Sequence, residues 1–167
     1  RHIVVLGGGF GGLRAARTIE PTISGRRHLQ LTVVNDRSHF LYTPLLPHVA
    51  AGRLPPPAVC VPLQRLLADS TQLVVDTVHE VDVQDRRLRG EHGDIPFDYL
   101  MFAPGSQVDW SSAPEASQWA LPYRDTSDAV GIADTLRDGF EDAGERTGED
   151  TPPAELTFAI IGGGPTG

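Results

Sequence analysis

The sequence predicts an α/β fold built on a parallel sheet, and three observations support this prediction. An apolar run over residues 3–6 leads through closely spaced glycines into a helical pattern, and a second apolar run follows at 29–34. Apolar or alternating runs recur at 73–83 and 97–103. The opening run and its glycines are repeated at 158–167. Strand, glycine turn, helix and strand form a βαβ unit, in which the two strands are parallel and the crossover is right-handed.

The composition fits a soluble globular protein. Of the 167 residues, 40% are hydrophobic and 22% are charged, which is a normal balance for a folded domain. The net charge of −8 opposes a nucleic-acid surface, which needs a basic patch. No apolar run approaches the roughly 20 residues that span a bilayer. We therefore expect a cytoplasmic protein that binds no nucleic acid.

The first βαβ unit has clear boundaries in the sequence. Residues 3–6 are apolar throughout, as in a strand buried on both faces. Residues 11–19 place Leu13, Ala16 and Ile19 on one helical face. Pro21 and the Ser24-Gly25 pair are expected to end this helix. Residues 29–34 form the second strand.

The remaining elements follow in chain order. We expect a structured loop at 41–57, a short helix at 61–68, one or two strands at 73–83, a polar turn at 90–94, a buried strand at 97–103, a loop with Trp110 and Trp119, a helix at 127–143, a polar linker at 144–153 and a strand at 156–161. We also expect a β-meander added to the parallel sheet.

The glycine loop after the first strand has the spacing G-x-G-x-x-G, at Gly7, Gly9 and Gly12. In this pattern the first glycine allows a sharp turn, the second lets a diphosphate approach the backbone, and the third lets the helix pack against the strand. The helix N-terminus adds N–H donors and a partial positive charge. The sequence therefore predicts a dinucleotide site, and the copy at Gly162, Gly164 and Gly167 predicts a second.

An acid at the end of the second strand normally accepts a hydrogen bond from the ribose. Here that strand ends in Asn35, Asp36 and Arg37. Asn35 occupies the position of the acid and Asp36 follows it, so either side chain could bind the ribose, with a slight preference for Asp36.

Four segments together resemble the pyridine-nucleotide-dependent flavin oxidoreductases, and most closely the type II NADH dehydrogenases. They are residues 5–13 (VLGGGFGGL), 40–47 (FLYTPLLP), 98–105 (DYLMFAPG) and 161–167 (IGGGPTG).

The resemblance implies FAD at the first glycine loop and NADH at the second, with NADPH open as an alternative hydride donor. The residues implied for FAD are Gly7, Gly9, Phe10, Gly11, Gly12, Asn35, Asp36, Arg37, Thr43, Pro44, Val78, Ala103, Pro104 and Gly105. Those implied for NADH are Gly162, Gly164 and Gly167.

The resemblance also implies a domain order. Residues 1–110 would be the first part of a discontinuous FAD-binding domain, residues 111–154 a crossover loop and helix, and residues 155–167 the start of a Rossmann-like NADH-binding domain that is truncated here. Two positions depart from the family pattern. Pro104 stands where a threonine is usual, and Asn35 stands where the acid is usual.

The implied activity is hydride transfer from NADH to flavin, followed by electron transfer to a quinone. The 167 residues alone are expected to be inactive, and none of their side chains stands out as an acid, base or nucleophile. A homodimer and peripheral attachment to the inner face of the cell membrane, through residues outside this sequence, are further expectations.

Two other interpretations stay open. A sulfide:quinone oxidoreductase shares the pattern around residues 34–44 but needs more cysteines than Cys60, the single cysteine of this sequence. A domain that senses NAD without turnover would need only one of the two loops. His39 and His48 flank Thr43 and Pro44 without a second cluster of ligands, so no metal site is expected.

Overall fold

The computed structural model describes residues 1–111, 113–145 and 157–162. The chain folds into two compact units. The first unit consists of residues 1–41 and 60–107, and the second of residues 42–59 and 108–167. The first unit contains the predicted βαβ unit and all of the parallel strands.

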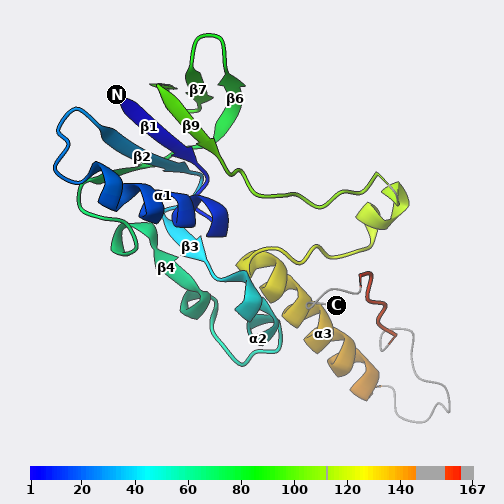
Figure 1. The fold of residues 1–167 in the computed structure, drawn as a ribbon. Coiled ribbons are helices and arrows are strands. Elements are labelled where there is room, and N and C mark those ends of the chain that lie inside the picture. Colours follow the sequence, from blue (N-terminus) through cyan, green and yellow to red (C-terminus); the bar gives the residue numbers. More distant parts are fainter. Residues whose placement is uncertain (112, 146–156, 163–167) are drawn as a thin grey trace. The chain divides into compact units, whose positions relative to one another are not determined.

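A four-stranded parallel sheet forms the centre of the first unit (Figure 1). Its strands are β1 (His2–Leu6), β2 (Gln30–Asn35), β5 (Thr71–Val75) and β9 (Tyr99–Phe102), in the spatial order β5-β2-β1-β9. All three neighbouring pairs are parallel. The predicted α/β fold with a parallel sheet is thus confirmed.

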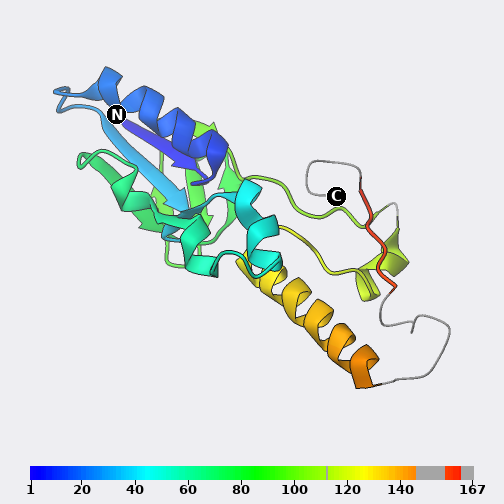
Figure 2. The same ribbon diagram turned by 90° about the horizontal axis from the view of Figure 1, so that it is seen from below.

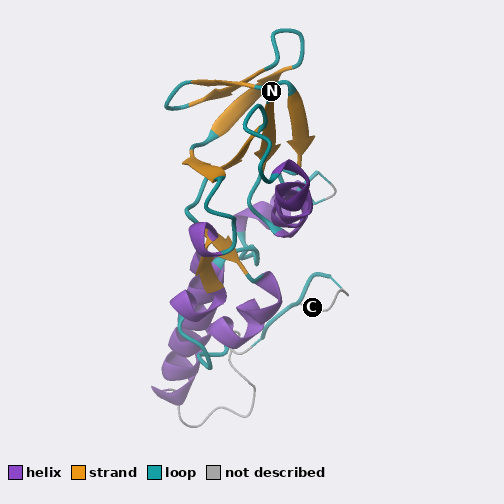
Figure 3. Ribbon diagram, turned by 60° about the vertical axis from the view of Figure 1, so that its left-hand side comes forward, coloured by secondary structure: helices purple, strands orange, loops and turns teal. Residues whose placement is uncertain are grey.

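Both faces of the central strands β1 and β2 are covered, and each cover buries its own apolar cluster. Strand β9 at the sheet edge is largely exposed, so the prediction of a buried strand at 97–103 is wrong in its burial. Helix α1 (Phe10–Ile23) lies alongside β1 and β2 on one face (Figures 1 and 2). An antiparallel meander covers the other face (Figure 3). It consists of β6 (Val78–Asp82), β7 (Arg87–Gly90) and β8 (Asp94–Pro96). The predicted meander is therefore confirmed, with its polar turn between β7 and β8.

The alternation of side chains along the strands explains this two-sided core. Successive residues of a strand point to opposite faces. Val5 and Val33 belong to the cluster under α1, whereas Val4 and Val34 belong to the cluster under the meander. All four are fully buried, which accounts for the continuous apolar runs in the sequence.

Helix α1 is longer than predicted, because Pro21 does not end it. The helix continues through Pro21 to Ile23, and Ser24 N–H still donates to the Glu20 carbonyl oxygen at 3.1 Å. Ile23 is buried in the core cluster under α1. Proline removes one backbone donor from the helix, and the burial of Ile23 offsets that loss.

The helix predicted at 61–68 is wrong. Strand β4 (Cys60–Pro62) instead pairs antiparallel with β3 (His39–Leu41), with Phe40 opposite Val61. Only the short 3-10 turn η3 (Leu63–Arg65) is helical. Pairing of Val61 with Phe40, together with complete burial of Leu63, fixes a conformation that local propensity does not predict.

In the second unit, part of the predicted loop at 41–57 is helical. It contains η1 (Thr43–Leu45), α2 (Leu46–Ala50) and η2 (Pro56–Val59). Leu46 and Val49 are buried on one side of α2, which contacts α3 (Thr126–Glu145). The Asp128 carboxylate accepts from Arg124 N–H and from Asp125 N–H, and Asp128 N–H donates to the Asp125 carboxylate. This reciprocal cap fixes the start of α3.

The strand predicted at 156–161 is not formed over the described residues 157–162. Ile160 and Ile161 are 74% and 78% exposed, and no strand of the described part of the chain pairs with them. An extended segment becomes a strand only when a neighbour takes up its backbone groups. The helix predicted at 127–143 is formed as α3 (Thr126–Glu145), and it follows the short 3-10 helix η4 (Pro114–Gln118). No helix of the described residues is long and apolar enough to span a membrane.

Candidate cofactor-binding site

The candidate site lies where the four parallel strands end. Gly7 follows β1, Asn35 ends β2, Asp76 follows β5 and Ala103 follows β9. Because the strands are parallel, these ends share one edge of the sheet. The chain leaves β1 toward β2 and β5 on one side and returns as β9 on the other. Ligands of open α/β sheets bind at such a reversal of strand order, which here falls between Gly7 and Ala103.

Gly7 makes the sharp turn out of β1. Its φ is +103°, a conformation that side chains disfavour. Its N–H donates to the Val34 carbonyl oxygen at 2.8 Å. A Cβ at this position would overlap the Ala103 carbonyl oxygen and lie 2.8 Å from the Ala103 carbonyl carbon. Gly7 is therefore required by the fold itself.

Gly12 and Gly9 meet different surroundings. A Cβ on Gly12 would overlap the Gly7 carbonyl oxygen and lie 3.3 Å from Val5 Cγ1, so Gly12 allows α1 to pack closely on β1. A Cβ on Gly9 would meet nothing within 4 Å. The φ of Gly9 is −76°, which any residue adopts. The fold needs Gly7 and Gly12, whereas no contact within the described part of the chain accounts for Gly9.

The head of α1 carries the electrostatics of an anion site. Its N-cap is Gly9, with no side-chain cap and no acidic residue in the first turn. The first helical hydrogen bond runs from Leu13 N–H to the Gly9 carbonyl oxygen at 2.9 Å. The Phe10 ring stands edge-on to Phe40 at 4.8 Å. Backbone N–H groups and the helix dipole together favour a phosphate here.

The residues at the end of β2 have different surroundings. The Asn35 amide accepts from Gly8 N–H at 2.7 Å and donates to the Arg37 carbonyl oxygen at 2.8 Å. The Asp36 side chain is 56% exposed and lies 3.5 Å from Arg37 Nε. Asn35 is thus bonded within the protein, while the Asp36 carboxylate faces solvent.

Sequence reasoning missed Asp76, the only acid among the buried residues of the described chain. Its carboxylate accepts from Glu91 N–H at 3.1 Å and from His92 Nδ1 at 2.9 Å. The hydrogen bond from His92 lowers the pKa of Asp76, and the same bond raises the pKa of His92. An acid directly after the apolar residues of β5 is the signal that could have revealed it.

Asp76, Glu91 and His92 also place one potential metal-ligand atom each within 4.8 Å of one another. The Asp76 oxygens already accept hydrogen bonds from the turn at 91–92. The hydrogen bonds and the ion pair with Asp76 therefore connect the turn of the meander to the end of β5.

The other residues implied for the cofactor lie in several places. Val78 begins β6, and Gly105, with φ +82°, follows Ala103 and the exposed Pro104. Thr43 and Pro44 lie in η1, in the second unit. Gly162 is the last described residue, with φ +125°, and Gly164 and Gly167 lie outside the described residues.

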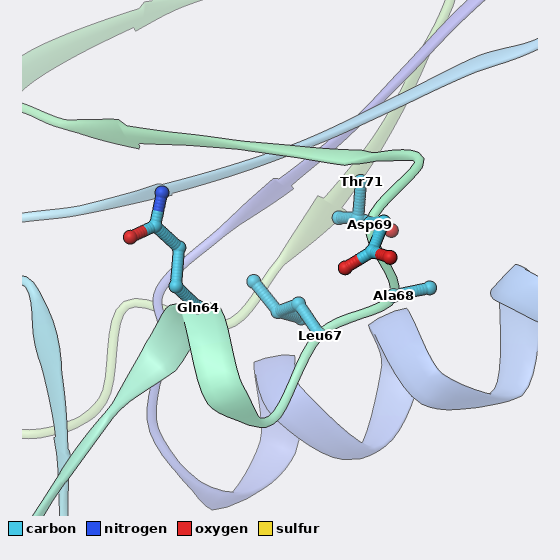
Figure 4. Close-up of a pocket in the computed structure, with 5 residues that line it drawn as sticks. All are labelled: Gln64, Leu67, Ala68, Asp69 and Thr71. Atoms are coloured by element: carbon cyan, nitrogen blue, oxygen red, sulfur yellow. The ribbon is translucent and has the colours of Figure 1, made fainter.

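A shallow depression of about 280 Å³ lies elsewhere in the first unit (Figure 4). Its lining residues are Gln64, Leu67, Ala68, Asp69 and Thr71. Thr71 is the first residue of β5, so the depression lies at the amino end of the strand. The candidate site lies at the carboxyl ends, and the two are therefore distinct.

An open parallel sheet with a glycine turn and an uncapped helix head at its switch point defines a dinucleotide-binding α/β protein. Comparison with known proteins agrees. The chain belongs to the pyridine nucleotide-disulphide oxidoreductase family, which matches residues 1–167.

The chain is similar to curated members of this family over its whole length. It is 28% identical to the type II NADH:quinone oxidoreductase NdhA of Mycobacterium tuberculosis, covering 100% of this chain and 36% of the relative. It is 26% identical to a probable mitochondrial NADH-ubiquinone oxidoreductase of Schizosaccharomyces pombe, covering 100% of this chain and 32% of the relative. The chain thus spans about a third of the length of these relatives.

Solved structures show the same fold. NDH2 from Plasmodium falciparum in complex with NADH has a TM-score of 0.73 at 21% identity, over 86% of this chain and 30% of that one. The sulfide:quinone oxidoreductase of Aquifex aeolicus has a TM-score of 0.72 at 22% identity, over 85% of this chain and 33% of that one.

Proposed function

We propose that this chain is part of an FAD-dependent NADH:quinone oxidoreductase and that its first glycine loop binds the FAD diphosphate. The observation that carries the proposal is the open space over Gly9. It lies at an uncapped helix head, between two glycines that the fold itself requires. A group that approaches the backbone at Gly9 gives a physical reason for that glycine.

The residues present fit this cofactor. N–H groups at the head of α1 would hold the diphosphate without reorganising, because the Gly7 turn and the Gly12 contact already fix the loop. The exposed Asp36 carboxylate would accept from the adenosine ribose. The backbone of Val78 would lie near the adenine, and residues 103–105 near the flavin ring.

When bound, FAD supplies the redox chemistry, taking a hydride from NADH and passing electrons to a quinone. The part of the described chain is to bind and orient the cofactor. The second glycine motif, from Gly162 to Gly167, would bind the NADH diphosphate in the same way. The names of the curated relatives, which are NADH:quinone and NADH-ubiquinone oxidoreductases, support this assignment.

The test is a spectrum of the purified full chain. We expect a yellow protein whose flavin absorbance bleaches when NADH is added without oxygen. A colourless protein that still binds NAD would refute the proposal and favour an NAD-sensing domain.

Residues 34–44 support a second candidate, a sulfide:quinone oxidoreductase, because their sequence resembles that class as well. The same spectrum separates the two candidates. Bleaching by sulfide and not by NADH would select the second.

A quinone substrate also supports a location at the inner face of the cell membrane, since quinones dissolve in the bilayer. We expect the full chain in the membrane fraction of lysed cells, to be released by detergent. Recovery of all the protein in the soluble fraction, with full quinone reductase activity, would contradict this location.

A further inference from the structure

We propose that Asn35 is a positioning residue of the first glycine loop and not a ligand of the ribose. The inference rests on the proposed function, because it concerns how that loop holds FAD. It assigns a role to the one position where this chain replaces the usual acid by an amide.

Asn35 joins three of the four strand ends at the candidate site. Its Oδ1 accepts from Gly8 N–H at 2.7 Å, on the loop that follows β1. Its Nδ2 donates to the Arg37 carbonyl oxygen at 2.8 Å, on the turn that follows β2. Its backbone carbonyl oxygen accepts from Asp76 N–H at 2.8 Å, after β5. Because one partner is a donor and the other an acceptor, the chemistry fixes which way the amide points.

The bond to Gly8 is partly buried, and its donor is the more buried of the two partners. Gly8 is buried, and a Cβ there would lie 2.7 Å from Leu63 Cδ1 and 2.9 Å from Asn35 Cγ. Leu63 is fully buried. An N–H packed in this way has poor access to water, so losing its acceptor is costly. Asn35 therefore holds the middle of the glycine loop one residue before Gly9.

This geometry also explains why the residue is an amide. A carboxylate at position 35 would still accept from Gly8 N–H, but it would face the Arg37 carbonyl oxygen with no proton to donate. The side chain that satisfies both partners is asparagine. In this arrangement the exposed carboxylate of Asp36 is left to meet the ribose.

A thermodynamic cycle on the full chain separates positioning from direct contact. Dissociation constants are measured for FAD and for FAD with a 2′-deoxyribose adenosine, with wild type and Asn35→Ala. Positioning predicts that the substitution weakens both ligands by the same factor, about tenfold, as expected for one hydrogen bond. Weakening confined to FAD would identify Asn35 as a ribose ligand and overturn the inference, and so would unchanged affinity for both.

Gln30→Ala is the matched control. Gln30 begins β2, and its side-chain amide donates to Gln72 Oε1 at 3.1 Å, at the opposite end of the strand from Asn35. Its removal costs an amide hydrogen bond of the same strand without touching the loop. We expect unchanged affinity for both ligands.

A second measurement needs no FAD and therefore stands apart from the proposed function. Amide hydrogen exchange of residues 7–10 in the ligand-free protein should be faster in Asn35→Ala, and Asn35→Asp should restore protection at Gly8 because it retains the acceptor. Equal exchange in wild type and Asn35→Ala would overturn the inference. A wild-type protein that shows this protection but binds no FAD would refute the proposed function and leave the role of Asn35 in the loop standing.

Discussion

Gly9→Ala is the substitution that most sharply separates ligand binding from folding in this structure. Gly9 has an ordinary φ of −76°, and the methyl group of an alanine there would meet no atom within 4 Å. No described atom of the protein clashes with that methyl group, so a large loss of FAD affinity would come from contact of the methyl group with the ligand. The substitution should leave the fold intact and disable the loop.

The expected change in the free energy of unfolding follows from the position of Gly9 as the N-cap of α1. Alanine is a poorer N-cap than glycine, which lowers the free energy of unfolding by about 1 kcal/mol. Alanine also lowers the conformational entropy of the unfolded chain, which raises the free energy of unfolding by about 0.4–1 kcal/mol. The free energy of unfolding should thus change by less than about 1 kcal/mol. Displacing the diphosphate from two N–H donors, each worth about 1.5–3 kcal/mol with a charged acceptor, should weaken FAD binding at least about 100-fold.

The assay pairs urea unfolding of the ligand-free protein with FAD titration followed by flavin fluorescence. Gly131→Ala is the control, since Gly131 lies within α3 and a Cβ there would also meet nothing within 4 Å. It should bind FAD normally and gain about 1 kcal/mol of helix stability. Normal FAD affinity in Gly9→Ala would refute the reasoning, because the open space over Gly9 would then have no ligand.

Three further predictions concern the frame around the site. Gly12→Ala should unfold the first unit or destabilise it by more than about 3 kcal/mol, because its Cβ overlaps the Gly7 carbonyl oxygen; a wild-type urea midpoint would contradict this. Glu20→Ala should lower the free energy of unfolding by about 1–2 kcal/mol, because Glu20 Oε1 accepts from Ala68 N–H and Thr71 Oγ1, each at 2.8 Å. Glu20→Gln, which keeps an acceptor oxygen, should lower it less, and an equal loss in the two variants would argue against these bonds. The pKa of His92 is raised by Asp76 from 6.5, so the pair stabilises the fold below that pH and loses its contribution as the pH rises through the higher folded pKa. The urea midpoint should therefore fall more between about pH 5.5 and pH 8.5 in wild type than in His92→Gln, and parallel falls would rule out this linkage.

Much of the fold could be predicted from local patterns because the central strands β1 and β2 are buried on both faces. The apolar run at 3–6 and the glycines after it were sufficient to predict β1, the turn and the start of α1. The alternation at 73–83 predicted the strands that became β5 and β6. These patterns are local consequences of burial and of backbone geometry, so neighbouring residues reveal them.

The errors came where distant contacts decide the local conformation. Residues 61–68 contain no signal for the pairing of Val61 with Phe40, about twenty residues earlier, and burial of Ile23 carries α1 past Pro21. The candidate site shows the same division. The spacing of Gly7, Gly9 and Gly12 identified the loop, whereas the bond from Gly8 to Asn35 and the burial of Asp76 depend on how three strand ends meet.

The most direct test of the central claim is a crystal structure of the full chain with FAD bound. We predict diphosphate oxygens about 2.7–3.1 Å from backbone nitrogens at residues 10–12, the distance of an ordinary hydrogen bond. Flavin bound elsewhere, with those nitrogens facing only water or protein, would contradict it.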